Sequence, residues 1–235
     1  MGRSHLTEGD TVAWWYEPNA PGCTSEAIVA LVRTRITTGE YPAGSPVRDG
    51  ALAKEFNVSR NTARESLSLL RHAGLLTQEP NRGFFVRTFG IDELKDLYRA
   101  RRVFEIRAVQ ESQDATDEAM ARVEASVVRA ENAPENEGWA DAQEHSASFH
   151  RAIVGLLGSP LLDEFYLNLM ARLSTTFSRS PEPGKYHSHW ANPHRDILEK
   201  IKSGDRQGAE GLLRIHLDDS EASTLDLARS VGAGR

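Results

Sequence analysis

The sequence has a single cysteine and no long run of apolar residues. Because Cys23 stands alone among 235 residues, an internal disulfide framework is excluded. No apolar run approaches the roughly 20 residues that a bilayer-spanning helix needs, and residues 1–22 lack the continuous apolar centre of a secretory signal. We therefore expect a soluble, cytoplasmic protein that has no membrane partner.

Positive charge is also scarce, except in one segment. The chain has 28 Lys and Arg residues against 34 Asp and Glu residues, a net charge of -6. Residues 25–87 contain nine Lys/Arg and six Asp/Glu, whereas residues 88–235 contain 18 and 25, so the net charges are +3 and -7. The chain length suits two modest domains, and the first has the charge that an anionic partner requires.

A capped amphipathic helix is predicted to begin next to Ser59. The Ser59 hydroxyl is suited to cap the free amides of a helix start, and apolar residues then repeat at the spacing of one buried face: Ala63, Leu67 and Leu70. Arg60, Asn61 and Arg64 fall outside that face. Since Arg60 and Arg64 are four residues apart, their guanidinium groups project from neighbouring turns, where they suit guanine edges or phosphates.

Two more helices are predicted before this one. Residues 49–56 form a short helix candidate that only Asn57 and Val58 separate from Ser59, as in a helix-turn-helix. Further upstream, an apolar face marks a first helix, which glycine and proline at residues 39–44 end: Ile28, Leu31, Val32 and Ile36. Three such helices can enclose a small core.

A β-hairpin is predicted after the third helix. Gly74 suits the position after a helix end, and residues 75–78 and 84–87 are strand candidates around a turn. Arg82 is expected at the tip beside Gly83, where the missing side chain permits close approach to a sugar-phosphate backbone. Each element also occurs in proteins that never bind nucleic acid. Their combined order is that of a winged helix-turn-helix and favours DNA binding.

Residues 52–86, LAKEFNVSRNTARESLSLLRHAGLLTQEPNRGFFV, resemble the amino-terminal domain of GntR-type bacterial transcription regulators. This resemblance implies DNA contacts at Arg60, Arg64 and Gly83. Many relatives have an arginine where this chain has Gly50, so we expect that contact to be absent or moved to Arg48. Motif and resemblance together nominate eight DNA-binding residues: Arg48, Ser59, Arg60, Asn61, Thr62, Arg64, Arg82 and Gly83.

The rest of the chain shows no convincing strand pattern and predicts an all-α helical bundle. Helices are expected at residues 92–112, 117–132, 139–157, 160–179, 189–202 and 206–228, between proline and glycine clusters. The expected architecture is mainly α, with a tail at 1–23, a winged helix-turn-helix with a small β-hairpin at 24–88 and a helical domain at 89–230. Trp14 and Trp15 are assigned to the tail.

Three histidines fall on three different predicted helices of this bundle. His150 and His216 lie at helical spacing from apolar neighbours, so both are expected to point inward. Together with His194, inward imidazoles can converge on one divalent cation. Hydrogen-bonded core histidines are the more ordinary alternative, and spacing alone does not decide between the two.

Three segments resemble the effector-binding FCD domain of the FadR subfamily of GntR regulators: YRARRVFEIRA at 98–108, FHRAI at 149–153 and PHRDILEKIKSGD at 193–205. Many members of that subfamily bind a metal through the three histidines and an aspartate one turn before the first. The aspartate position here is Ser146, and the nearby Glu144 and His145 are expected to point away from the face of His150. The resemblance therefore implies an incomplete site for Zn²⁺, or for Ni²⁺ or Mn²⁺.

Arg101 and Glu105 match a charged pair on the first helix of that effector domain, although a surface or interhelix ion pair is the alternative. Facing a cavity, the Arg101 guanidinium can bind a carboxylate through two parallel hydrogen bonds. The effector site implied by the resemblance shares its histidines with the metal: Arg101, Ser146, His150, His194 and His216. His187, His189 and Trp190 are assigned no role.

The predicted function is that of a DNA-binding transcriptional regulator. We expect a repressor that a small organic acid, a carboxylate, releases from a palindromic operator, and a homodimer, because one winged helix contacts few base pairs. The alternative is a dimeric DNA-binding protein with no effector or metal site, for which Ser146 is the best support. An enzyme is not expected, because no acid or base is clearly placed beside the histidines.

Overall fold

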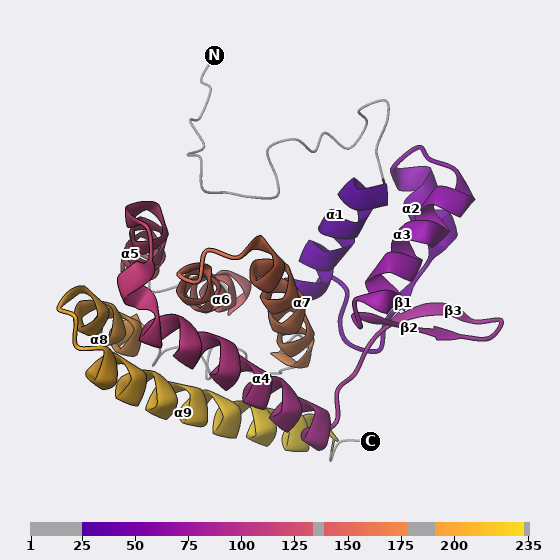
Figure 1. Cartoon of the computed structure of the whole chain (residues 1–235). Helices are drawn as coiled ribbons and strands as arrows, with labels where there is room; N and C mark the ends of the chain where they lie inside the picture. Colours follow the sequence, from indigo (N-terminus) through magenta and orange to yellow (C-terminus); the bar gives the residue numbers. More distant parts are fainter. Residues whose placement is uncertain (1–24, 134–138, 178–190, 233–235) are drawn as a thin grey trace.

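The computed structural model describes residues 25–133, 139–177 and 191–232. Within these ranges the chain forms a head, residues 25–86, and a helical bundle, residues 91–232 (Figure 1). The tail expected at residues 1–23, with Trp14 and Trp15, lies outside the described residues. So do His187, His189 and Trp190.

The head consists of three short helices and a small antiparallel sheet. The helices are α1 (Ser25–Thr37), α2 (Asp49–Glu55) and α3 (Arg60–His72). The strands are β1 (Pro46–Val47), β2 (Leu76–Glu79) and β3 (Gly83–Val86), in the order β1-β3-β2. This arrangement confirms the predicted winged helix-turn-helix fold.

The sheet has one strand more than the predicted hairpin. β1 pairs with β3, with Pro46 opposite Phe85 and Val47 opposite Phe84. A hydrogen bond from Gly44 N to Val86 O, at 2.9 Å, extends this pairing by the residues before β1. A two-residue strand has no periodicity to detect, and proline argues against a strand, so the local pattern does not reveal β1.

The turn between β2 and β3 accounts for the glycine at position 83. Asn81 has a φ of 59° and Gly83 a φ of 95°, both in the left-handed region. Asparagine tolerates this region better than most residues, and glycine adopts it without steric cost. The conformation of the wing therefore favours Gly83 even before any role at DNA is considered.

The three helices and the sheet of the head pack around one apolar core. It contains side chains that are at most 3% exposed: Ile28, Val32, Ile36, Val47, Leu52, Phe56, Ala63, Leu67, Leu70, Leu75, Leu76, Phe84 and Val86. Leu31, expected on the same face as Ile28, is only partly buried at its edge. This core holds α3 with its other face turned outward.

The described part of the bundle contains six α-helices. They are α4 (Ile91–Gln110), α5 (Asp117–Glu131), α6 (Trp139–Gly155), α7 (Pro160–Phe177), α8 (Ala191–Lys202) and α9 (Arg206–Gly232). Each corresponds to a predicted helix. Residues 112–114 form a separate 3₁₀ turn instead of the end of α4, and α9 continues four residues past the predicted residue 228. None of these helices is long and apolar enough to cross a bilayer.

The bundle helices enclose two neighbouring apolar cores. α4 and α9 lie side by side, α6 and α7 pack against α4, and α5 and α8 close the far end (Figure 1). One core includes Val123, Phe149 and Leu213, and the other includes Leu94 and Tyr98. Buried polar side chains lie where these cores meet.

Candidate functional site

Two hydroxyl residues shape the start of α3. Ser59 is the N-cap, and its Oγ accepts a hydrogen bond from the backbone N–H of Thr62 at 3.0 Å. The hydroxyl oxygens of Ser59 and Thr62 are 2.8 Å apart. Such a cap satisfies one of the free N–H groups of a helix start and fixes where the helix begins. The two residues therefore position the arginines on the first turns.

The outer face of α3 presents polar and cationic groups to solvent. Arg60, Asn61 and Arg64 are all exposed. Two bonds from Arg60, from Nη2 at 3.1 Å and from Nε at 3.2 Å, hold its side chain to Oδ1 of Asp49 in α2, yet the side chain is 75% exposed. Arg48 and Arg64 are exposed and make no ion pair with any residue that the structure describes.

The wing adds one more exposed cation to this side of the head. Arg82 is 68% exposed, pairs with Glu79, and its guanidinium carbon lies 5.1 Å from the centre of the Phe85 ring. Ring and carboxylate restrain the side chain at the hairpin tip. A Cβ at Gly83 would meet no atom within 4 Å, so the backbone there is open on the side-chain face.

Gly50 lies in the first turn of α2, beside the Asp49 that holds Arg60. It is exposed, and a Cβ added there would meet no heavy atom within 4 Å. Its backbone is helical and does not require glycine. The position therefore has room for a long side chain. Steric exclusion does not explain why glycine stands here where many relatives have an arginine.

The bundle brings the three predicted histidines together. His150 of α6, His194 of α8 and His216 of α9 are at most 4% exposed. The Nε2 atom of His216 lies 3.2 Å from Nε2 of His150 and 3.2 Å from Nε2 of His194. One ligand nitrogen from each ring lies within 4.8 Å of the others. Three residues far apart in the chain thus form one cluster.

Burial lowers the pKa of all three histidines. Loss of hydration disfavours the imidazolium form, and it is the largest cause at each ring. The pKa of His216 falls to about 3, and that of His194 lies well below its usual value. The rings are therefore neutral at pH 7, which is the form that binds metals.

A buried carboxylate organises the cluster from α4. Oε1 of Glu105 accepts hydrogen bonds from Arg101 Nε at 2.8 Å and from the Tyr166 hydroxyl, and Oε2 lies 2.6 Å from Nδ1 of His150. Burial by itself raises the pKa of Glu105, but the charge of Arg101 and the hydrogen bonds from His150 and Tyr166 bring it down to about 2. An ionised carboxylate can only accept, so His150 donates through Nδ1 and keeps Nε2 free as a ligand.

A small cavity that includes several polar side chains lies beside the histidine cluster. Its volume is about 20 Å³, and it is lined from four helices: Tyr98, Arg101, Gln143, Ser146, Ala147, His150, Met170, Leu173, Ser174, Phe177 and Ser220. Nη2 of Arg101 and Oε1 of Gln143 are buried and have no hydrogen-bond partner among the described residues. Leaving a buried polar group unpaired costs roughly 1–3 kcal/mol. The two atoms therefore mark a place for a polar ligand.

The sequence pointed to some of these groups and not to others. Arg101 faces the cavity as expected, and Ser146 shares its wall with His150. Glu105 was expected only as the partner of Arg101, and nothing pointed to Gln143 or Tyr166. The available signal was a carboxylate on a buried helix face, which requires a buried partner.

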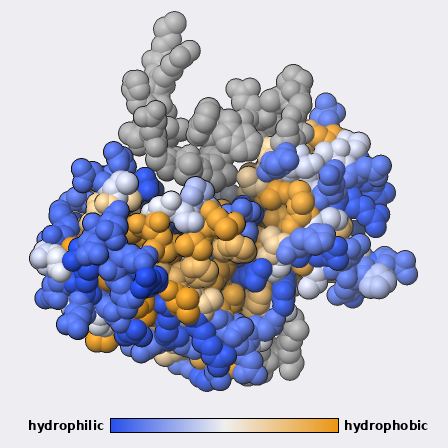
Figure 2. Space-filling model, in the orientation of Figure 1, coloured by the Kyte–Doolittle hydropathy of each residue, from blue (hydrophilic) through white to orange (hydrophobic). Residues whose placement is uncertain are grey.

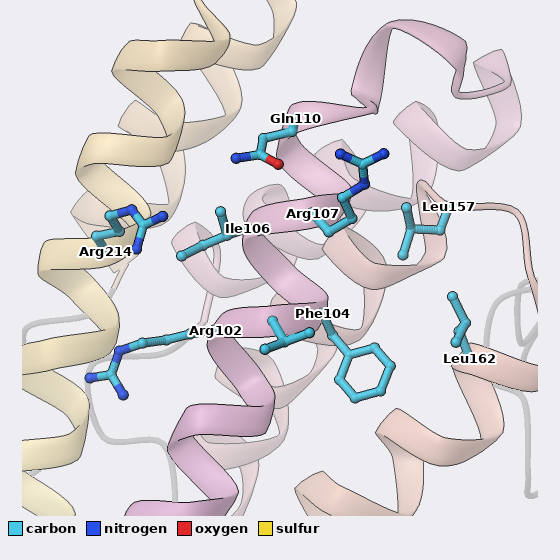
Figure 3. Close-up of a pocket in the computed structure, with 9 residues that line it drawn as sticks. Arg102, Phe104, Ile106, Arg107, Gln110, Leu157, Leu162 and Arg214 are labelled. Carbon is cyan, nitrogen blue, oxygen red and sulfur yellow. The ribbon is translucent and has the colours of Figure 1, made fainter.

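A larger hollow lies on the outside of the bundle and shares no lining residue with the histidine cavity. This groove of about 540 Å³ is lined by Arg102, Val103, Phe104, Ile106, Arg107, Gln110, Leu157, Leu162 and Arg214 (Figure 3). Figure 3 shows Phe104 and Leu162 on its α7 side and Arg102 and Arg214 toward α9. The Arg102 guanidinium is bonded to Asp218 and Glu221 of α9. The bonds hold this guanidinium at α9, and most of the surface that lines the groove is apolar.

Comparison with known proteins assigns both parts of the chain. Residues 24–86 match the bacterial regulatory proteins of the gntR family, and residues 96–219, more than half of the chain, match the FCD domain. An uncharacterized HTH-type transcriptional regulator, BphR of Paraburkholderia xenovorans (strain LB400), is 28% identical over 210 residues, which cover 83% of this chain and 82% of that protein.

Two further relatives span nearly the same region. The HTH-type transcriptional repressor RspR of Escherichia coli (strain K12) is 22% identical over 214 residues, covering 91% of this chain and 93% of that protein. The crystal structure of a putative transcriptional regulator GntR from Rhodococcus sp. RHA1 has a TM-score of 0.79 at 25% identity, covering 86% of this chain and 97% of that one. The chain therefore belongs to the gntR family of bacterial regulatory proteins and is a DNA-binding transcriptional regulator with an FCD domain.

Proposed function

We propose that this regulator is a repressor of the FadR subfamily whose affinity for a palindromic operator is lowered by a small organic acid. The observation that supports an effector is the cavity beside His150, where Arg101 and Gln143 present buried polar atoms without partners among the described residues. The likeness to RspR, which is named a repressor, supports repression. We place the DNA-binding domain at residues 24–88 and the effector domain at 89–230.

We infer that the N-terminal turns of α3 enter the major groove. Arg60, Asn61 and Arg64 are exposed there, and a guanidinium can contact two acceptors of a guanine edge at once. Arg48, Ser59 and Thr62 are assigned to phosphates and to the shape of the helix start. Arg82 and Gly83 are assigned to the sugar-phosphate backbone reached by the wing.

A homodimer supplies the second head that a palindrome requires. Large apolar side chains are exposed on α4 and α7, where Val103 is 70%, Leu161 62% and Phe165 58% exposed. Figure 2 shows apolar side chains gathered on the face over these helices. Contiguous apolar surface on a soluble protein usually marks an interface, and a two-fold dimer uses the same patch twice. We assign this face, with the adjoining groove, to a second copy of the chain.

The histidine cluster fits a divalent cation such as Zn²⁺, with Ni²⁺ or Mn²⁺ as alternatives. Zn–N bonds of roughly 2.0–2.1 Å in a tetrahedral site separate the ligand nitrogens by about 3.3 Å. The two 3.2 Å separations at His216 are close to this value. The rings are neutral, and the carboxylate of Glu105 orients His150 as in many metal sites. A bound cation would supply positive charge and an open position for a ligand oxygen.

The acid is assigned to the cavity that His150 and Arg101 line. Arg101 already donates through Nε to Glu105, so Nη2 is the donor left for a ligand carboxylate. Oε1 of Gln143 is an acceptor and suits a hydroxyl or another donor on the ligand. Ser146 is shorter than the aspartate of many relatives, so room for a ligand oxygen is left beside His150.

A dimeric DNA-binding protein with neither metal nor effector is the competing function. Ser146 supplies no anionic ligand, and separations of 3.2 Å between imidazole nitrogens are also hydrogen-bond distances. In that case the histidine cluster is a structural part of the core.

Elemental analysis and thermal unfolding separate these two functions. Protein purified without chelator or a metal-affinity column should contain about one zinc, nickel or manganese ion per chain if three histidines and one open position form a site. His150→Ala, His194→Ala and His216→Ala should each lower that content. A panel of mono-, di- and tricarboxylates should include one that raises the melting temperature. Absence of both metal and stabilisation would support the competing function.

The DNA-binding assignment is tested on an operator selected from a pool of randomised duplexes. Arg64→Ala should abolish specific binding, measured by fluorescence anisotropy at fixed salt, while circular dichroism stays unchanged. Arg71→Ala is the matched control, because it removes the same charge from an exposed position near the other end of α3. Unchanged operator affinity in Arg64→Ala would contradict the assignment.

A further inference from the structure

One face of helix α7 contacts the head. Ala171, 2% exposed, belongs to the apolar core of the head. Oδ1 of Asn168 accepts a hydrogen bond from Nη2 of Arg33 in α1 at 3.2 Å. Arg172 donates from Nε and Nη2 to the carbonyl oxygen of Ala73 at 3.0 and 2.8 Å. Figure 1 shows α7 beside α1 and the end of α3.

The Arg172 contact is made at the C-terminal end of α3, the helix that we assign to the major groove. α3 ends at His72, and Ala73 is its C-cap. The last carbonyls of a helix have no partner within the helix, and this end has a partial negative charge. A guanidinium that donates two hydrogen bonds there satisfies a carbonyl and complements the helix dipole. Arg172 thus holds the end of the element that faces DNA.

Gly74 keeps the space that this contact needs. Its φ is +76°, and a Cβ at this position would lie 2.9 Å from Cζ, Nε and Nη2 of Arg172. The left-handed conformation alone would still accept asparagine. The guanidinium excludes that choice as well, since any side chain at position 74 would push Arg172 away from Ala73.

The nearly opposite face of α7 reaches the histidine cavity. Met170, Leu173, Ser174 and Phe177 are four of the eleven residues that line it. Tyr166, one turn earlier on the same face, donates to Glu105, and Glu105 in turn bonds His150. Direct contacts therefore run from His150 through Glu105 and Tyr166 into α7, and from α7 through Arg172 to Ala73.

We propose that Arg172 is a positioning residue for the head, and that α7 transmits ligand binding at His150, in the histidine cluster or the adjoining cavity, to the end of α3. The proposal rests on the proposed function, because it takes the cluster and the cavity as ligand sites. A cavity of about 20 Å³ holds about one water, so an acid enters only if the lining moves. Displacement of α7 then changes the placement of each head, and in a dimer it changes the operator spacing that two heads can span.

The bonds from Arg172 to the carbonyl oxygen of Ala73 are called the clamp below. Hydrogen exchange of the full-length protein, followed by mass spectrometry, tests whether the clamp holds the end of α3. The amides of Gly74 and Leu75 donate to the carbonyls of Arg71 and Leu70, both at 3.0 Å, and report on the end of α3. Arg172→Ala should speed their exchange on the order of tenfold, because two charge-assisted bonds are lost. Arg229→Ala is the matched control, since Arg229 is exposed and pairs with Asp226 on its own helix.

Two outcomes decide the clamp. An unchanged exchange rate at Gly74 and Leu75 in Arg172→Ala overturns it. If Arg172→Ala fails to fold, Arg172→Gln decides instead, because glutamine keeps most of the length and one neutral donor. It should give a smaller increase in the exchange rate, and no increase overturns the clamp.

Zinc alone tests the transmission. In the wild type, ZnCl₂ should change exchange at Gly74 and Leu75, and Tyr166→Phe should abolish that change while elemental analysis still finds zinc bound. Bound zinc with unchanged exchange in the wild type overturns the transmission. If the wild type binds no zinc, the proposed metal site fails instead. Tyr166→Phe then decides, because loss of its bond to Glu105 must itself speed exchange at Gly74, and an unchanged rate overturns the transmission.

Discussion

Glu105 is the residue at which three buried polar side chains of three helices meet. It is fully buried and accepts from Arg101 and Tyr166 while it orients His150. A buried ion pair adds little net stability, but removing one partner leaves an uncompensated charge. Loss of the Glu105 charge should therefore have two effects that can be measured separately, one on the free energy of unfolding and one on metal binding by the histidine cluster.

Glu105→Gln should weaken metal binding and destabilise the fold. We expect zinc affinity to fall about 10–100-fold, as for other carboxylates that orient a metal-bound histidine. The free energy of unfolding should fall by about 3–5 kcal/mol, because Arg101 loses its buried counter-ion. Competition with a zinc chelator and urea unfolding measure the two effects. Glu111→Gln, at a half-buried position later on the chain that pairs with Arg107, is the control and should change neither.

Gly50→Arg should strengthen DNA binding. The position is open and helical, so an arginine adds a cation near Arg60 without a clash. One new phosphate contact should steepen the slope of log K against log salt by about 0.9. Gly211→Arg makes the same change in α9, at an exposed position where a Cβ also meets nothing within 4 Å. If both variants gave the same slope as the wild type, Gly50 would not lie at the DNA surface.

At the scale of elements, α3 depends on its cap for both position and stability. Ser59 fixes the first turn, and Arg60 and Arg64 project from the turns that follow. α5 begins in the same way, where Thr116 Oγ1 accepts from Ala119 N at 3.2 Å. The two caps are chemically alike, but only α3 presents arginines that we assign to DNA.

Ser59→Ala and Thr116→Ala should therefore have similar effects on stability and different effects on DNA binding. Each should lower the free energy of unfolding by about 1 kcal/mol, the usual effect of losing an N-cap hydroxyl. Only Ser59→Ala should weaken operator binding, because only α3 holds the arginines that we assign to DNA. Thermal unfolding and anisotropy titrations measure the two quantities. Equal operator affinity in both variants would contradict the role of the cap in placing Arg60 and Arg64.

At the scale of the whole molecule, the proposed dimer uses the exposed apolar face of α4 and α7. Val103, 70% exposed, lines the groove, whose surface is mainly apolar. Val128 of α5 is 41% exposed and does not line the groove. The two valines therefore form a matched pair for testing which surface joins two copies.

Val103→Glu should shift the protein from dimer to monomer in sedimentation equilibrium, because a carboxylate on each copy would be buried at a two-fold contact. Operator affinity should fall with it, since each monomer brings only one head. Val128→Glu should leave both unchanged. A Val103→Glu protein that sediments as a dimer would move the interface elsewhere.

Much of the fold could be predicted because its determinants are local. The Ser59 cap, the apolar stripe of α3 and the turn at Gly83 each involve residues within a few positions of one another. Helix periodicity likewise predicted all six bundle helices. β1 escaped prediction because Pro46 and Val47 form a strand only through their pairing with β3, some 40 residues later.

Local sequence patterns were enough to predict a capped basic helix with a wing, a helical bundle and three histidines on inward helix faces. The packing of distant segments brings these histidines together, connects them to α7 through Glu105 and Tyr166, and places Arg172 on Ala73. Those contacts join residues 22 to 99 positions apart. Periodicity places a side chain on a face of its own helix, whereas the partner of that face depends on how all the helices pack together.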